Sequence, residues 1–158
     1  MGKLVSIGPW KLEVDAEGTK KIYQTVKHTS PADCNCQTCR NFLATGEKAF
    51  PVQFLILLQR LGIEASKAAE VYAAATLTNK HVLYGVWFHC IGHIQAGPQN
   101  ATADENVSQW PWHEIAEGLQ VVVDTKRALA FPEFGDTPLV RIEFQVELPW
   151  ILSEKLEL

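Results

Sequence analysis

Strict alternation of apolar and polar residues over Leu139–Trp150 constrains the fold of this chain more than any other feature. One set of alternate positions is apolar: Val140, Ile142, Phe144, Val146 and Leu148. The other set is polar: Arg141, Glu143, Gln145 and Glu147. Because successive side chains of a strand point to opposite faces, the pattern predicts a strand with one packed and one solvent-exposed face, as in an antiparallel sheet.

Three further segments have the composition of strands. His81–Ile94 is rich in aromatic and β-branched residues, and its even positions from Val82 to Cys90 all suit a core. Leu119–Thr125 is a second strand, which Pro132, Gly135 and Pro138 separate from the one after it. Trp10–Val14 alternates apolar and polar residues and predicts a short strand.

Helical signals are concentrated in the first half of the chain. Asp15 can cap a helix over Ala16–Lys27, but Gly18 disfavours a helix interior, so a hairpin turning at Asp15–Gly18 is the alternative. Thr29–Ser30–Pro31 ends either element, because the residue before a proline avoids the α region. A short helix is expected to begin near Cys39.

A second helix is predicted over Pro51–Leu61, with proline in its first turn and Gly62 at its end. Its residues are apolar on most sides, so we expect it to be the central buried helix. Lys67–Thr76 is ambiguous and favours a helical turn followed by a strand. Residues 95–113 are expected to form a long polar loop containing Trp110–Pro111–Trp112.

These elements predict an α+β fold, in which two or three helices pack on one face of an antiparallel sheet. A chain of 158 residues has the length of one domain, so residues 1–158 are taken as a single α+β domain. Fourteen basic and 18 acidic side chains give a formal charge of −4, which does not favour nucleic acid as a partner. No segment has the length of a membrane span or the pattern of a signal peptide, so the expected location is the cytoplasm.

The residues with the clearest chemistry are Cys34, Cys36 and Cys39, which follow the pattern C-x-C-x-x-C. Cysteines in a reducing compartment are free thiols or metal ligands more often than disulfides. Three thiolates within six residues can wrap around one zinc ion, which then needs a fourth ligand. We therefore predict a structural zinc site at these three residues.

Four residues compete to be the fourth zinc ligand: His28, His89, Cys90 and His93. On a strand, His89 and His93 lie about 13 Å apart and cannot share one ion, whereas on a helix they would form a pair. Cys90 points to the opposite, apolar side of the strand and is expected to be a buried core thiol. His89 is thus the preferred fourth ligand and His28 the alternative close in sequence.

Other functions remain open for the same chain. Cys36 and Cys39 can act as redox thiols, because a cysteine at a helix N-terminus has a stabilised thiolate and Arg40 adds to that effect. The tryptophans of Trp110–Pro111–Trp112 can anchor a protein partner, or fold back to cover the sheet. Plain reduced structural cysteines are the simplest alternative. No catalytic motif decides whether the chain is an enzyme.

Three short motifs resemble a group of small uncharacterised bacterial proteins. They are Asp33-Cys34-x-Cys36-x-x-Cys39-Arg40-Asn41-Phe42, Tyr84-Gly85-x-Trp87-Phe88-His89, and Glu143-Phe144 with Pro149-Trp150. The resemblance implies a single bacterial cytoplasmic domain and implies no substrate. It also implies that Cys34, Cys36, Cys39 and His89 share one neighbourhood.

Overall fold

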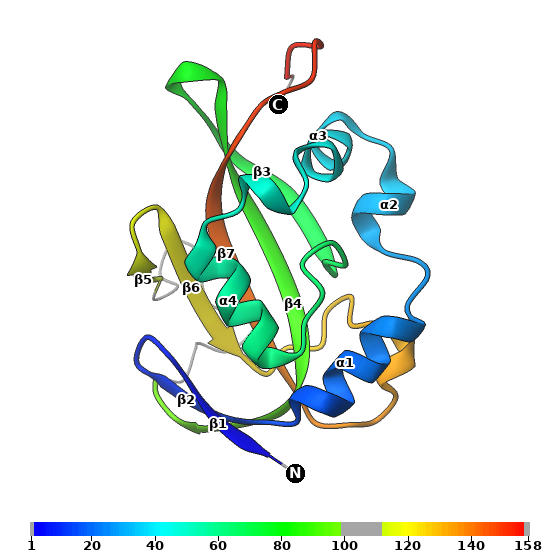
Figure 1. Cartoon of the computed structure of the whole chain (residues 1–158), viewed down its shortest axis with the longest axis vertical. Coiled ribbons are helices and arrows are strands. Elements are labelled where there is room, and N and C mark those ends of the chain that lie inside the picture. Colours follow the sequence, from blue (N-terminus) through cyan, green and yellow to red (C-terminus); the bar gives the residue numbers. More distant parts are fainter. Residues whose placement is uncertain (1, 99–111, 157–158) are drawn as a thin grey trace.

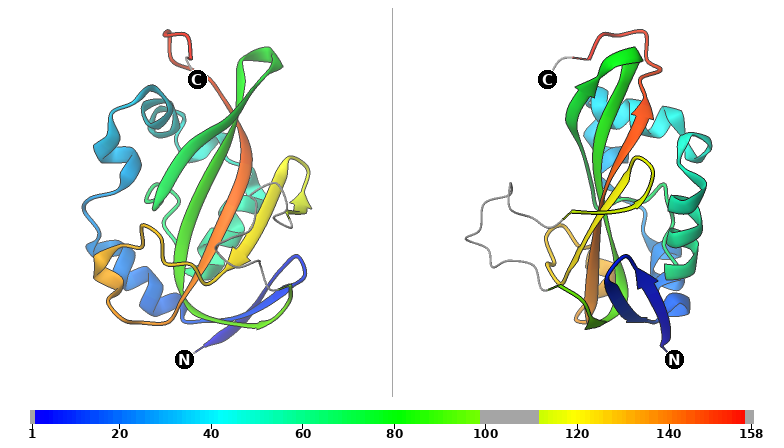
Figure 2. Two further views of the ribbon diagram at one scale, coloured as in Figure 1. Left: turned by 180° about the vertical axis from the view of Figure 1, so that it is seen from behind. Right: turned by 90° about the vertical axis from the view of Figure 1, so that its left-hand side faces the viewer.

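A computed structural model describes residues 2–98 and 112–156 and shows a twisted antiparallel sheet with helices on one of its faces (Figures 1 and 2). The strands are β1 (Lys3–Ile7), β2 (Trp10–Val14), β3 (Glu70–Leu77), β4 (His81–Ala96), β5 (His113–Ala116), β6 (Leu119–Asp124) and β7 (Leu139–Pro149). The helices are α1 (Ala16–Thr25), α2 (Ser30–Cys34), α3 (Gln37–Thr45) and α4 (Val52–Leu61). The predicted α+β class is confirmed.

The sheet is organised around β4, its longest strand. The strand order is β1-β2-β4-β7-β6-β5, and β3 also pairs with β4. β7 pairs with β4 from His81 to Ile91, and β2 pairs with it from Gly92 to Ala96. β7 thus flanks the first part of β4, and β2 flanks its last residues along the opposite edge.

The apolar core lies between the sheet and the helices. All five even positions of β4 from Val82 to Cys90 are buried, as are the five apolar positions of β7. Phe54 of α4 packs edge-on against Phe144 of β7 at a centroid distance of 4.7 Å and also contacts Phe88 of β4. The predicted inward faces of both strands are confirmed.

The helix after Asp15 is also confirmed, and the hairpin alternative is wrong. Asp15 Oδ1 accepts a hydrogen bond from the Gly18 amide at 2.9 Å, which caps α1. A Cβ at position 18 would lie only 2.3 Å from Asp15 Oδ2. Glycine therefore makes room for the cap, and this offsets its poor helix propensity.

Two expectations about the helical half are wrong. α4 is not buried on most sides, because its Val52 and Ile56 side chains are 66% and 52% exposed; the helix lies on the sheet by one face only. Thr29–Ser30–Pro31 was expected to end an element, but it begins α2: Ser30 is the first residue of this helix, and Thr29 is the N-cap, whose hydroxyl accepts a hydrogen bond from the Ala32 amide. Proline suits this first turn because it needs no intrahelical donor.

The segment predicted as a loop over residues 95–113 begins later than expected, since β4 extends to Ala96. Trp110 and Pro111 lie outside the described residues.

The ambiguous segment Lys67–Thr76 forms strand β3 from Glu70 onward. None of the described helices is both long and apolar enough to cross a lipid bilayer.

The expectation that the polar face of β7 is exposed to solvent is wrong for half of its residues. Arg141 is 3% exposed and Glu143 is 2% exposed. Tyr72 of β3 hydrogen-bonds Glu143, and the Trp87 ring of β4 lies against Arg141. These side chains cover a polar row that the alternating pattern alone assigns to water.

Candidate metal centre

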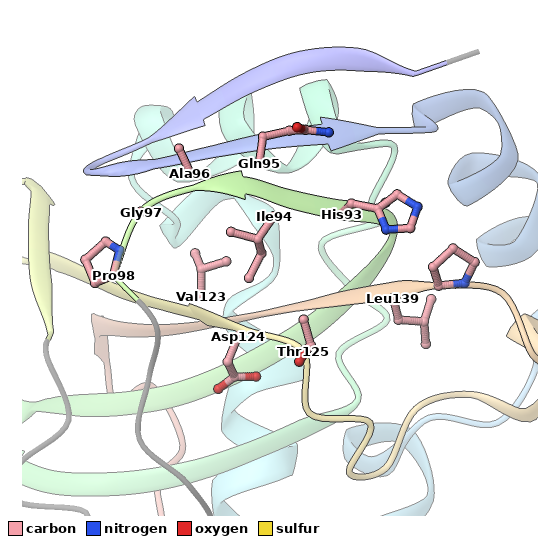
Figure 3. Close-up of a pocket in the computed structure, with 12 residues that line it drawn as sticks. His93, Ile94, Gln95, Ala96, Gly97, Pro98, Val123, Asp124, Thr125 and Leu139 are labelled. Atoms are coloured by element: carbon pink, nitrogen blue, oxygen red, sulfur yellow. The ribbon is translucent and has the colours of Figure 1, made fainter.

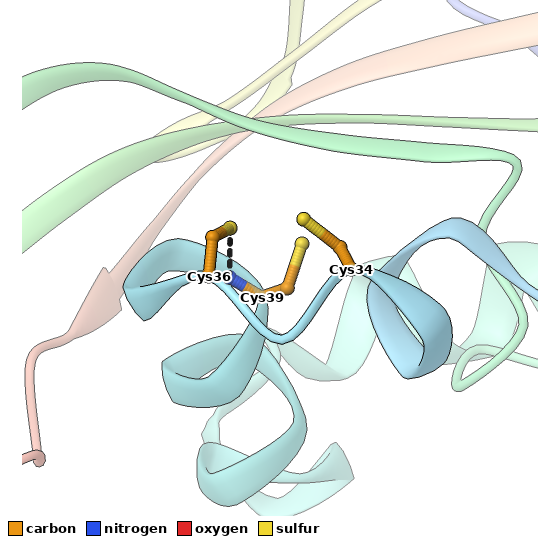
Figure 4. A group of neighbouring side chains, drawn as sticks. All are labelled: Cys34, Cys36 and Cys39. Atoms are coloured by element: carbon orange, nitrogen blue, oxygen red, sulfur yellow. Dashed lines mark hydrogen bonds between the residues drawn. The ribbon is translucent and has the colours of Figure 1, made fainter.

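The three cysteines lie where α2 meets α3 (Figure 4). Cys34 is the last residue of α2, and Asn35 then takes a left-handed conformation with φ of 55°. Cys36 is the N-cap of α3, and Cys39 is in the first turn of that helix. The reversal at Asn35 turns the chain back on itself and brings residues 34, 36 and 39 to one side.

The sulfur atoms of Cys34, Cys36 and Cys39 all lie within 4.8 Å of one another. Sulfur atoms bound to one tetrahedral zinc at 2.3 Å lie about 3.8 Å apart. An ion therefore requires the sulfur atoms to approach by at most about 1 Å, which side-chain rotation can supply. Cys34 and Cys36 are exposed and Cys39 is buried, so an ion here would be reached from solvent.

Hydrogen bonding distinguishes the two thiols of α3. Burial tends to raise the pKa of Cys36, but the Cys39 amide, which donates to Cys36 Sγ at 3.4 Å, and the neighbouring thiols lower it below its ordinary value overall. Burial and the bonds to the other two thiols raise the pKa of Cys39. Cys36 is thus the more readily ionised thiol, as expected at a helix N-terminus.

Polar contacts hold α3 against the sheet next to these thiols. Tyr84 of β4 donates a hydrogen bond to the Thr38 carbonyl at 2.9 Å. Asn41, which is fully buried, donates to Tyr84 Oη at 3.1 Å and to the Pro149 carbonyl at 3.0 Å, and accepts from the Ile151 amide at 2.8 Å. The first turn of α3 is therefore fixed to β4 and to the end of β7. The sequence pattern gave no role to Asn41, although it lies two residues after the last cysteine.

The segment after β7 also folds over this end of α3. Arg40 binds both carboxylate oxygens of Glu154, at 2.5 and 3.0 Å, and its Nε donates to the Asn35 carbonyl. The hydrogen bonds from Arg40 lower the pKa of Glu154 to about 2. Gln37 donates to the same carboxylate at 3.3 Å. Arg40 thus connects the turn between the cysteines to the C-terminal segment, in addition to its predicted electrostatic effect.

The structure does not place His89 with the three thiols. Within residues 2–98 and 112–156, no histidine or carboxylate joins the group of ligand atoms. His89 lies on the opposite face of the sheet, where its Nε2 is 3.0 Å from the Lys126 carbonyl. The role of His89 as fourth zinc ligand thus stays a prediction that this arrangement does not favour.

The other three candidates for the fourth position are also located. His28 is exposed and its Nδ1 lies 3.4 Å from Asp33, the residue before Cys34. Cys90 is fully buried in the core, as predicted, and burial raises its pKa to about 12. His93 is exposed near the far end of β4. His28 is therefore the histidine closest in sequence to the thiols, and its ring contacts the residue that precedes Cys34.

Comparison with protein-family models, with curated proteins and with solved structures returns no significant match for this chain. The chemistry of the site therefore rests on its own geometry. Three thiols in one small volume can bind a thiophilic metal ion, and two of them can form a disulfide.

Proposed function

We propose that this chain binds zinc through Cys34, Cys36 and Cys39. The observation that supports the proposal is the mutual distance of at most 4.8 Å among the three sulfur atoms. Thiolates are the ligands that zinc prefers in structural sites. In a cytoplasmic protein these thiols would be reduced and available to the ion.

The proposed ion would stabilise the connection between α2 and α3. Binding a metal only in the folded state adds its binding free energy to the stability of the fold. Cys34, Cys36 and Cys39 supply three ligands, and we expect water or a histidine, His28 or His89, in the fourth position. An open or weakly held fourth position distinguishes this site from a closed four-cysteine site.

Metal analysis of the untagged protein, purified under reducing conditions, tests the proposal. We expect about one zinc per chain, and thiols that become reactive only after a chelator is added. Cobalt(II) substitution should give thiolate-to-metal charge-transfer absorption whose intensity drops in Cys34→Ser, Cys36→Ser and Cys39→Ser. Cys90→Ala is the matched control, because that thiol lies in the core, and should bind cobalt normally.

Freely reactive Cys34, Cys36 and Cys39 thiols, with no bound zinc and no charge-transfer band in cobalt, would refute the proposal. Replacement of His28 by Gln and of His89 by Gln separates the two histidines. Loss of affinity in one variant alone identifies the fourth ligand, and unchanged affinity in both assigns that position to water.

A thiol–disulfide exchange function at Cys36 and Cys39 is the second candidate. It is supported by the exposed Cys36 with a lowered pKa beside the buried Cys39 with a raised pKa. In this reaction the Cys36 thiolate attacks a substrate disulfide and releases one substrate thiol. The Cys39 thiolate then attacks Cys36 and releases the second, so that the substrate is reduced and a Cys36–Cys39 disulfide forms.

The two functions use the same thiols and are distinguished by measurement. A zinc protein masks its thiols when it is reduced, whereas an exchange protein loses two thiols reversibly on treatment with a small disulfide. The resemblance to small bacterial proteins, a cytoplasmic location and the interaction role of Trp110–Pro111–Trp112 stay predictions.

A further inference from the structure

The three thiols of the cluster approach their common centre from one side. Cys34 ends α2, Cys36 caps α3 and Cys39 lies in the first turn of α3, with the left-handed turn at Asn35 between them. Their sulfur atoms point toward one another (Figure 4) and lie within 4.8 Å of one another. The ligands of a tetrahedral ion surround it, so three ligands from one side leave the fourth direction open.

No protein group is in place to fill that fourth direction. Within residues 2–98 and 112–156, no histidine or carboxylate joins the three sulfur atoms. His28 Nδ1 lies 3.4 Å from the Asp33 carboxylate, and His89 Nε2 lies 3.0 Å from the Lys126 carbonyl. Each ring would have to leave its present contact to bind an ion beside the thiols. A ligand that forms only three bonds needs no such rearrangement.

The charge of the occupied site also depends on the central atom. Three thiolates around a divalent ion keep one negative charge, and around a monovalent copper ion they keep two. Cys39 is only 2% exposed, and burying an unbalanced charge costs free energy. Arg40, the cation next to Cys39 in the chain, already binds both carboxylate oxygens of Glu154. A trivalent centre leaves no net charge on the three thiolates.

Trivalent arsenic meets both requirements, because it forms three bonds and keeps a lone pair in the fourth direction. Its ordinary form in neutral water is the uncharged arsenous acid, which carries three hydroxyl groups. With three thiols, three arsenic–oxygen bonds break and three arsenic–sulfur bonds form, and each hydroxyl leaves as water with one thiol proton. Arsenic stays trivalent throughout, so the reaction needs no oxidant or reductant. Soft thiolate ligands favour such thiophilic centres.

We propose that Cys34, Cys36 and Cys39 together bind one trivalent thiophilic centre, delivered as the neutral hydroxide of arsenic or antimony. This inference rests on the proposed function, since it uses the same three thiols as the ligands of one centre. Cys34 and Cys36 are exposed, so the hydroxide reaches them directly from solvent. An arsenic–sulfur bond is nearly as long as a zinc–sulfur bond, about 2.3 Å, so a similar small approach of the sulfur atoms closes the site.

Other parts of the described chain do not offer three thiols. The fourth cysteine, Cys90, is fully buried in the core. A cleft of about 720 Å³ at the end of β4 is lined by His93 and Asp124 but by no cysteine (Figure 3). Asp124 accepts hydrogen bonds from Arg141 on both oxygens. It belongs to a buried polar row on the outer face of the sheet: His89, Asp124, Arg141 and Glu143. One arsenic per chain is therefore expected.

Sodium arsenite added to the full, metal-free chain tests the proposal, with a phosphine as reductant because a thiol reductant would itself bind arsenic. Mass spectrometry should show the addition of one arsenic and the loss of three hydrogens. A thiol assay on the same sample should find three of the four cysteines masked, and an excess of a small dithiol should release them. Cys90→Ala should take up arsenic as the unaltered chain does.

Two probes separate a site of three thiols from an ordinary pair. Cys34→Ser leaves Cys36 and Cys39, so arsenite should bind at least tenfold more weakly. Phenylarsine oxide bonds to only two thiols, and its affinity for Cys34→Ser should change less than about threefold. His93→Gln, in the cleft, should change neither affinity. The thiol count of the unaltered chain decides the question even where Cys34→Ser does not fold.

Zinc added to the same metal-free samples distinguishes this inference from the proposed function. Uptake of both zinc and arsenic, each preventing the other, supports both. Arsenic held by three thiols without zinc uptake supports the inference and refutes the zinc site. Zinc uptake with at most two thiols masked by arsenite would overturn the inference and leave the zinc site standing. Uptake of neither would overturn both.

Discussion

Replacement of Arg141 by methionine tests the energetic importance of the polar row on the outer face of the sheet. Methionine has a similar length and fills most of the same volume, but it cannot donate hydrogen bonds and carries no charge. The change removes two hydrogen bonds to Asp124 and the ion pair with Glu143. Two carboxylates are then left buried without their cation.

The expected loss follows from these contacts. Removing one partner of a buried ion pair costs about 3–5 kcal/mol. Two hydrogen bonds to charged groups, at about 1.5–3 kcal/mol each, give a similar total, and the two figures describe the same interactions and are not added. We expect the free energy of unfolding to fall by about 4 kcal/mol at neutral pH, a large part of the 5–15 kcal/mol typical of a domain. The deficit should shrink as the pH falls, because burial raises the pKa of Glu143 and its protonation removes one uncompensated charge.

Urea unfolding at pH 7 measures this effect through the midpoint at constant slope. Arg60→Met is the matched control, because Arg60 lies exposed in the last turn of α4 and its loss should cost less than about 0.5 kcal/mol. If the free energies of unfolding of Arg141→Met and Arg60→Met differ by less than about 1 kcal/mol, solvent reaches the polar row and the reasoning is wrong.

Three further predictions concern the metal centre and the pH dependence. Asn41→Ala removes three hydrogen bonds made by a buried side chain, so thermal unfolding should show a loss of about 2–3 kcal/mol, and affinity for the proposed zinc should fall because α3 is no longer anchored. Under the redox hypothesis, Cys39→Ser should abolish the reversible loss of two thiols in a thiol assay, whereas Cys34→Ser should retain it. The pKa of His89 is about 4 in the folded chain and near 6.5 when unfolded, so the unfolded chain binds more protons between these values. Stability should therefore fall by about 2–3 kcal/mol as the pH drops from about 6.5 to 4. Urea unfolding measured across this pH range should lack this pH-dependent loss of stability in His89→Gln. His28→Gln should retain the loss, because the His28 ring is exposed.

The face of the sheet that packs on the helices was predictable, because every side chain on that face must be apolar to be buried there. Every second residue of β4 and β7 meets the helices, so apolar side chains recur with period two over both strands. The cap at Asp15 was also predictable, because a carboxylate just before a helix commonly accepts a hydrogen bond from an amide of the first turn.

The other face of the sheet was not predictable from alternation. A polar residue at an alternate position indicates that the side chain points away from the core, but it does not indicate what covers it. Arg141 and Glu143 are covered by side chains from β3 and β4 that are distant in the sequence. The clue in the sequence was weak: oppositely charged residues two apart on one strand, with tyrosine and tryptophan on its neighbours. Which strands become neighbours is decided only by the complete fold.

The thiol cluster was found because its ligands are local, and its supports were missed because they are not. Cys34, Cys36 and Cys39 are brought together by one turn at Asn35, so spacing alone identifies them. Tyr84 lies more than 40 residues away and Glu154 more than 110, and no spacing rule relates either to the cysteines. The fourth ligand was harder to predict for the same reason. His89 was preferred because it lies on a core strand, but its neighbours, such as Arg141 of β7, are fixed by strand pairing that the sequence does not show.

β4 contacts both the thiol-bearing helix α3 and the buried polar row, and it keeps the two apart. Tyr84, on its helix-facing side, holds α3 and the thiols, whereas His89, on the other side, belongs to the polar row. Five residues of extended strand place their Cα atoms about 16 Å apart. Changes at that separation, without shared partners, add independently in most proteins. Loss of the proposed metal should therefore destabilise the turn between α2 and α3, whereas loss of the polar row should destabilise the sheet. We expect the coupling free energy between the two changes to be small.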